Sequence, residues 1–145
     1  MLLAWCGNRT KGNEAIKQKH IAHIAIAEDE MRILKLISFV LRSAGYIATG
    51  VSTGAGLVAA VLSSHSTDCP VDVIICDFYM PDQTGLQIMK ELAAQKITVP
   101  LVIMSGLSDE NILAQLKAEG CSYFLSKPFN PEELLQMVEK ILRRS

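Results

Sequence analysis

The stretch Val71-Asp72-Val73-Ile74-Ile75-Cys76-Asp77 decides how this chain folds. It is an apolar run that closes on an aspartate, and Phe78-Tyr79-Met80-Pro81 then turns the chain away. Short continuous apolar runs bounded by turn residues are typical of strands that are buried on both faces of a parallel sheet. The rest of the chain can be interpreted outward from this strand.

Three further apolar runs end in residues with charged or hydroxyl side chains. These are Ile24-Ala25-Ile26-Ala27 before Glu28-Asp29, Pro100-Leu101-Val102-Ile103-Met104 before Ser105, and Tyr123-Phe124-Leu125-Ser126 before Lys127-Pro128. In parallel sheets the working residues gather in the crevice outside the carboxyl ends of the strands. We therefore expect three carboxylates, one hydroxyl and one ammonium at a single edge.

The chain alternates strand-like and helix-like segments, which predicts an α/β domain with a parallel sheet covered on both faces. We expect strands near 22–27, 46–51, 71–76, 99–104 and 121–126, and helices over 31–44, 56–64, 84–94, 108–118 and 131–142. Thr84 and Ser108 are good helix N-caps, and Gly45 and Gly120 are typical residues at helix ends.

Composition limits the class of protein. The 145 residues suit one domain over 21–145, preceded by an extension over 1–20 that shows no apolar period and that we expect to be loose. A net charge of -1 argues against nucleic-acid binding through charge alone. No apolar stretch approaches the 18 residues that a membrane span needs. Cys6, Cys69, Cys76 and Cys121 form no zinc motif, so we expect reduced thiols in a cytosolic protein.

The expected cluster of acids needs a cation. Three carboxylates in one crevice repel one another unless a positive charge lies among them. A hard divalent ion with oxygen ligands, Mg²⁺ or Mn²⁺, resolves that repulsion. A carboxylate beside such an ion, a lysine and a hydroxyl has the groups needed to accept a phosphoryl group on aspartate. Asp77 is the candidate nucleophile.

These ordered features resemble the receiver domain of two-component response regulators, of the kind seen in the single-domain chemotaxis regulator. The resemblance covers residues 21–144. It rests on the acidic pair after the first strand, on Asp77 followed by Met80-Pro81 and Gly85, on Ser105, and on Lys127-Pro128-Phe129. It implies a flavodoxin-like fold, a doubly wound five-stranded parallel sheet of order 2-1-3-4-5 with helices on both faces.

The resemblance also implies a role for each site residue. Asp77 would be the phosphoacceptor, and the metal would be held by Glu28, Asp29, Asp77 and the backbone carbonyl of Tyr79. Ser105 and Lys127 would contact the phosphoryl group, Phe124 would be the aromatic that moves with Ser105, and Pro128 would follow a cis peptide bond. Glu28 is one methylene longer than the commoner aspartate, so its metal contact would run through water. Tyr79 and Leu107 would exclude the hydrolytic water and prolong the life of the phosphoryl group.

The implied function is signal reception in the cytoplasm. A histidine kinase or a histidine phosphotransfer protein would supply the phosphoryl group. The target would be a protein that contacts the fourth helix, fifth strand and fifth helix, roughly 108–118, 121–125 and 131–142. We expect a monomer or weak dimer. The chain would be no enzyme beyond Mg²⁺-dependent self-phosphorylation and slow autodephosphorylation.

Three other interpretations compete with this one. Gly54-Ala55-Gly56-Leu57-Val58-Ala59 fits the dinucleotide-binding pattern G-x-G-x-x-A, but Ser52-Thr53 separate it from the strand, and it leaves the acids unused. A haloacid-dehalogenase-type phosphatase would need a second aspartate two residues after Asp77, where Tyr79 stands. A phosphorylation-independent interaction module with a vestigial crevice would be favoured if Asp77 or Lys127 were missing.

Overall fold

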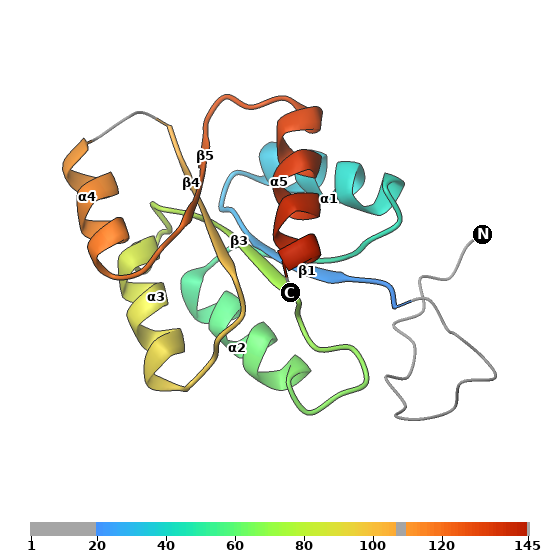
Figure 1. Ribbon diagram of the computed structural model, residues 1–145, viewed down its shortest axis with the longest axis horizontal. Helices are drawn as coiled ribbons and strands as arrows, with labels where there is room; N and C mark the ends of the chain where they lie inside the picture. The colour runs from blue at the N-terminus through green and yellow to red at the C-terminus, as the bar shows by residue number, and fades with distance from the viewer. Residues whose placement is uncertain (1–19, 107–109, 145) are drawn as a thin grey trace.

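The computed structural model describes residues 20–106 and 110–144 of the chain (Figure 1). Strands and helices alternate along it. In chain order they are β1 (His23–Ala27), α1 (Met31–Ser43), β2 (Ile47–Val51), α2 (Gly54–Ser64), β3 (Val73–Asp77), α3 (Gly85–Ala94), β4 (Leu101–Ser105), α4 (Glu110–Ala118), β5 (Tyr123–Ser126) and α5 (Pro131–Arg144). In the part of the chain described, no helix is both long and apolar enough to cross a membrane.

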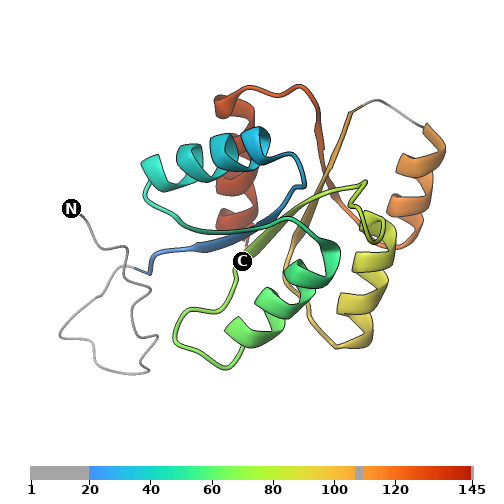
Figure 2. The ribbon, with the colours of Figure 1, turned by 180° about the vertical axis from the view of Figure 1, so that it is seen from behind.

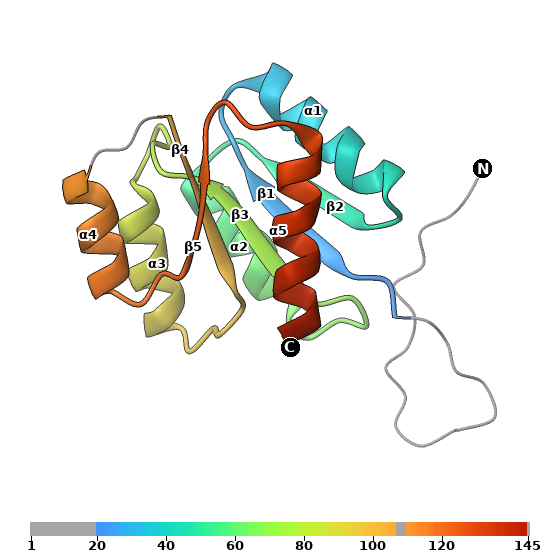
Figure 3. The same ribbon diagram turned by 45° about the horizontal axis from the view of Figure 1, so that its top comes forward.

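The five strands form one parallel sheet in the order β2-β1-β3-β4-β5. Helices α1 and α5 cover one face, and α2, α3 and α4 cover the other (Figure 2 and Figure 3). This confirms the predicted flavodoxin-like fold and its strand order. Because β1 and β3 lie in the middle of the sheet, all five residues of each are buried.

Local sequence explains where the helices begin and end. Helix α1 places its buried residues Leu34, Ile37 and Leu41 three or four positions apart, which is the period of one helix face. It stops before Gly45, whose φ of +94° is a left-handed conformation that favours glycine. Helix α3 begins with a capping box, in which Thr84 and Gln87 each hydrogen-bond to the other's backbone N–H.

The boundaries differ from the predicted ones by at most two residues. Strands β3 and β4 end one residue later than predicted, so Asp77 and Ser105 are the last residues of their strands. Helix α2 begins at Gly54 because the Thr53 hydroxyl accepts a hydrogen bond from the Gly56 N–H. The predicted cap Ser108 lies outside the described residues, and so does the predicted loose extension except for His20.

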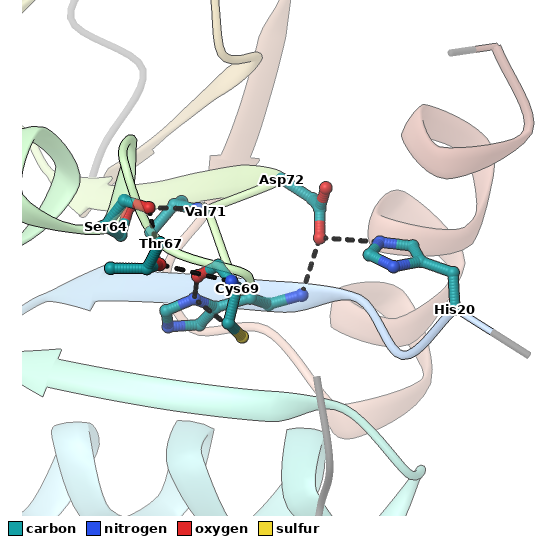
Figure 4. A network of polar contacts seen from close by, with 7 residues as sticks. His20, Ser64, Thr67, Cys69, Val71 and Asp72 are labelled. Carbon is teal, nitrogen blue, oxygen red and sulfur yellow. Dashed lines mark hydrogen bonds and ion pairs between the residues drawn. The ribbon is translucent and has the colours of Figure 1, made fainter. Parts of the chain in front are cut away.

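A polar network ties β1 to its neighbours at the amino edge of the sheet (Figure 4). The His23 ring lies with Nδ1 2.9 Å from the Cys69 carbonyl oxygen and Nε2 2.7 Å from the Thr49 hydroxyl. Asp72 accepts a hydrogen bond from the His23 backbone N–H at 2.8 Å and lies 3.1 Å from His20 Nε2. Among the described residues, no buried side-chain nitrogen or oxygen lacks a hydrogen-bond partner.

The cysteines are only partly as expected. Cys76 and Cys121 are free and buried, and burial raises the pKa of both thiols. Cys69 is disulfide-bonded, so the prediction of reduced thiols is wrong for this residue. Cys69 lies in the connection before β3, and the spacing of cysteines in a sequence does not determine which of them pair. Cys6 lies outside the described residues.

Candidate functional site

The carboxyl edge of the sheet gathers the three predicted carboxylates. Asp77 ends β3, and Glu28 and Asp29 follow β1, the strand hydrogen-bonded beside it. One carboxylate oxygen from each lies within 4.8 Å of the other two. Glu28 is only 1% exposed, Asp77 is largely buried, and Asp29 is exposed to solvent. The parallel pairing of β1 and β3 therefore creates an acidic cluster that opens outward through Asp29.

Lys127 inserts its ammonium group between two of these carboxylates. Its Nζ lies 2.5 Å from Glu28 Oε1 and 3.1 Å from Asp77 Oδ2. Lys127 follows β5, and its backbone N–H donates to the Ser105 carbonyl at the end of β4. The peptide bond between Lys127 and Pro128 is cis. Residues from β1, β3, β4 and β5 thus meet at one edge, as expected from the strand ends.

Burial and charge act against each other on these groups. Burial raises the pKa of Glu28, and the Asp77 charge raises it further, although hydrogen bonds from Lys127 and from the Glu30 N–H oppose the rise. Burial alone would lower the pKa of Lys127, but hydrogen bonds and charge from Glu28 and Asp77 outweigh burial and raise it. The ammonium therefore keeps its proton at neutral pH and contacts two of the three carboxylates, Glu28 and Asp77.

The donor set fits a hard divalent ion. All three side chains offer carboxylate oxygens, the ligands that Mg²⁺ and Mn²⁺ prefer. Both oxygens of Glu28 are already engaged, one by Lys127 and the other by the Glu30 N–H. The expectation that Glu28 reaches the metal through water stays a prediction. Asp29, the exposed member, has the freest access to an ion that keeps several of its own waters.

The remaining predicted residues lie on β4, on β5 and in the loop after β3. Ser105 ends β4 and is half-buried; its neighbour Met104 is the register partner of Asp77. Phe124 is half-buried in β5, with Lys117 Nζ 5.9 Å from the centre of its ring. Tyr79 is 61% exposed, and its ring packs edge-on against Phe78. The predicted water-excluding residue Leu107 lies outside the described residues.

The structure also explains the glycine-rich start of α2. The Gly54 and Ala55 N–H groups donate to the two carboxylate oxygens of Asp82, at 2.8 and 2.9 Å, and Thr53 accepts from Gly56. A dinucleotide pyrophosphate would need these same amide donors. Because the chain itself already uses them, the dinucleotide-binding interpretation is not supported. Sequence reasoning missed Asp82, since its partners are 27 and 28 positions away.

Comparison with known proteins agrees with this geometry. The family profile described as the response regulator receiver domain matches residues 24–139. The response regulator SaeR of Staphylococcus aureus is 27% identical over 124 residues, which is 86% of this chain and 52% of that protein. The chain therefore spans about half the length of the curated relatives that it matches.

Solved structures give the same result. The chemotaxis response regulator CheY4 of Vibrio cholerae superimposes with a TM-score of 0.75 and 28% identity, covering 83% of this chain and 98% of that one. The receiver domain of the Francisella response regulator 1452 superimposes with a TM-score of 0.72 and 31% identity, covering 85% of this chain and 98% of that one.

Proposed function

This chain belongs to the response regulator receiver domain family of two-component systems, and we propose that Asp77 is the residue on which it accepts a phosphoryl group. The donor would be a histidine kinase or a histidine phosphotransfer protein. The observation that carries the proposal is the position of Asp77, which shares its cluster with two further carboxylates and contacts the Lys127 ammonium at 3.1 Å.

The chemistry is a transfer between two nucleophiles. An Asp77 carboxylate oxygen attacks the phosphorus of a phosphohistidine, an O–P bond forms, and the N–P bond breaks. The released imidazole nitrogen takes a proton from solvent. The product is an acyl phosphate on Asp77, and its new negative charge must be balanced within the same crevice.

The residues around Asp77 suit that task. Lys127 lies close enough to reach a phosphoryl oxygen, because it already contacts the carboxylate that would carry the group. Glu28 and Asp29, with Asp77 and the Tyr79 carbonyl, would hold Mg²⁺ or Mn²⁺. When bound, such an ion neutralises phosphoryl oxygens and the excess of acidic charge. Ser105 would donate its hydroxyl to a phosphoryl oxygen.

A switch would follow from the movement of Ser105. If its hydroxyl turns toward the phosphoryl group, Phe124 gains space to turn inward, and the surface formed by α4, β5 and α5 changes. A protein target would bind there. Ser105→Ala should still accept the phosphoryl group, yet amide exchange across residues 110–118 should no longer respond to it. A normal response in this variant would remove Ser105 from the switch.

The direct test of the proposed function uses intact mass. With acetyl phosphate and Mg²⁺, the protein should gain one phosphoryl group, and Asp77→Asn should gain none. No mass gain in the native chain, in the presence of each candidate kinase as well, would favour an interaction module that works without phosphorylation. Phosphotransfer profiling against the host's histidine kinases would then identify the donor. A phosphatase of the haloacid dehalogenase type is not supported, because Tyr79 stands where its second aspartate would be.

Where the protein acts and how it assembles are also proposals. We propose a cytoplasmic protein, because histidine kinases of two-component systems transfer their phosphoryl group there, and a monomer or a weak dimer in solution. Sedimentation with and without acetyl phosphate would measure the assembly.

A further inference from the structure

The loop that follows Asp77 is hydrogen-bonded at its tip to the start of α2, which belongs to a different βα unit. Residues 78–84 connect β3 to α3, and the loop tip lies beside the start of α2 (Figure 2). Asp82 accepts one hydrogen bond on each carboxylate oxygen, from Gly54 at 2.8 Å and from Ala55 at 2.9 Å. This two-pronged contact is the geometry that fixes the orientation of a carboxylate most firmly.

The contact remains charged at neutral pH. The backbone hydrogen bonds from Ala55 and Gly54 lower the pKa of the Asp82 carboxyl group. A carboxylate at the first turn of a helix is also favoured by the helix dipole. Asp82 and Thr53 together satisfy the first three N–H groups of α2, so this helix start depends on a residue of the neighbouring loop.

Hydrogen bonds across the loop connect its tip to the residues next to Asp77. The Met80 N–H donates to the Gln83 carbonyl at 3.2 Å, and Tyr79 forms an antiparallel bridge with Thr84. The Gly85 N–H donates to the Phe78 carbonyl at 2.6 Å. Each bond joins one side of the loop to the other, so a displacement of Asp82 is passed back to Tyr79 and Phe78.

Close packing supports the same connection. A Cβ atom added to Gly54 would lie 2.5 Å from Gln83 Cγ and 2.8 Å from Gln83 Nε2. The loop therefore touches the first residue of α2 through a second side chain, next to the one that makes the hydrogen bonds. Only glycine at position 54 allows the loop to approach without displacing Gln83.

We propose that Asp82 is a positioning residue of the phosphorylation site, which holds the loop after β3 against α2 and thereby places the Tyr79 carbonyl toward the metal-binding carboxylates. This inference rests on the proposed function, because it assigns Tyr79 a metal-ligand role. Mg²⁺ demands near-ideal octahedral geometry, so a ligand displaced by a fraction of an ångström weakens binding. Residues that orient metal ligands typically contribute about 10- to 100-fold to affinity.

The test compares three variants. Asp82→Ala removes both hydrogen bonds, and Asp82→Asn keeps one acceptor oxygen. Thr53→Ala is the matched control, because it removes a cap at the same helix start without touching the loop. Calorimetry would measure the Mg²⁺ affinity, acetyl phosphate would measure the phosphorylation rate, and amide exchange of residues 78–84 in metal-free protein would measure the loop.

We expect Asp82→Ala to weaken Mg²⁺ binding about tenfold and to accelerate exchange in the loop, with Asp82→Asn in between. Thr53→Ala should leave the Mg²⁺ affinity and the loop exchange rate within about twofold of the native values, even if it lowers the melting temperature as much as Asp82→Ala does. The tenfold loss should persist at 0.5 M salt, where the field of an exposed carboxylate is screened. Unchanged affinity in Asp82→Ala, an equal loss in Thr53→Ala, or a loss that disappears in salt would each overturn the proposal.

The native chain and Asp77→Asn are measured in the same series. If the native chain takes up no phosphoryl group, the proposed function fails, while Mg²⁺ affinity and metal-free exchange still report on the loop. If the native chain is phosphorylated and Asp82→Ala matches it in all three measurements, only the positioning role fails.

Discussion

The two ends of β1 and β3 hold different polar clusters. At the amino ends, His23 and Asp72 belong to a hydrogen-bond network with Thr49 and the backbone. At the carboxyl ends of the same strands, Glu28 and Asp77 lie beside a third acid, Asp29. The first group uses its polar atoms in hydrogen bonds between neighbouring segments. The second places three acids around one ammonium. The two edges of one sheet thus differ in how their polar groups are matched: the amino edge pairs them in hydrogen bonds, and the carboxyl edge gathers three carboxylates around one ammonium.

The difference separates a structural cluster from a site. Buried polar groups are tolerated when each finds a partner, and a network of this kind stabilises the fold without needing a ligand. Like charges held within 4.8 Å raise the free energy of the folded chain until a cation binds. Excess charge, and not polarity alone, is therefore the feature that points to function here. The five predictions below test this contrast.

The largest difference should be in phosphoryl uptake, when the aspartate at each end of β3 is replaced in turn by asparagine. Asp77→Asn should abolish phosphoryl uptake from acetyl phosphate, because no nucleophilic carboxylate remains at that position. Asp72→Asn should keep it, since its carbonyl oxygen can still accept the bond from the His23 N–H. Intact mass spectrometry would compare the two. Equal uptake by both variants would remove the distinction between the edges.

Metal binding should show the next largest difference. Asp29→Ala removes the exposed carboxylate of the cluster and should weaken Mg²⁺ binding by about 100-fold, near the upper end of what metal-site substitutions cost. Asp72→Asn serves as the control at the other edge and should bind Mg²⁺ as the native chain does. Calorimetry would measure both. A native affinity in Asp29→Ala would show that the exposed carboxylate is not a ligand.

The lifetime of the phosphoryl group should also change by about 100-fold. Tyr79 and Leu107 offer no carboxylate or amide to orient a hydrolytic water, so we expect slow decay in the native chain. The Tyr79→Asn, Leu107→Glu double variant should decay faster, measured after excess donor is removed. His23→Asn at the amino edge should leave the rate unchanged. Decay of the native chain within seconds would contradict the shielding role.

Stability should fall on substitution at the amino edge but not at the carboxyl edge. Thr49→Val leaves His23 Nε2 without its partner and should lower the free energy of unfolding by about 1–3 kcal/mol. Glu28→Gln removes a carboxylate that burial makes costly to ionise, and its amide oxygen can still accept from Lys127. It should leave the metal-free protein equally stable or more stable. Urea denaturation without divalent ions would measure both variants.

The pH dependence follows from the direction of the Glu28 shift. Its pKa is raised from 4.5 in the folded chain, mainly by burial, so the folded state binds the proton more tightly than the unfolded state. The stability from this group is fully present below pH 4.5 and is lost as the pH rises through the raised value. The stability of Glu28→Gln relative to the native chain should therefore increase over that interval, and a constant difference would contradict the assignment.

Much of the carboxyl edge could be predicted because it depends on strand ends. An apolar run that stops at Asp77 reveals a strand and its last residue together, and parallel pairing then brings Glu28 and Lys127 to the same place. The helices could be predicted equally well from the sequence, since the apolar residues of α1 repeat with the period of a helix face. Their ends differed by at most two residues, because caps and neighbouring segments decide where a helix stops.

The remaining features depend on contacts between loops, which have no local pattern. Asp82 looks like an ordinary turn residue after Pro81, and only the folded chain shows that it accepts from Gly54. The same holds for His23 and Thr49, which lie on separate strands and meet through their register. The Cys69 disulfide was missed because spacing between cysteines does not determine which sulfurs approach one another.

The two buried thiols provide built-in reporters of how the sheet opens. Cys76 precedes Asp77 in the central strand β3, and Cys121 lies just before the edge strand β5. A thiol reagent can reach either sulfur only when its surroundings open, so the labelling rate under native conditions measures a free energy of opening. Cys121 should react through local fraying of the edge, and Cys76 only through near-complete unfolding. The gap between the two rates would then show how much more firmly the chain holds the strand of its proposed phosphoacceptor than the surface expected to carry the signal.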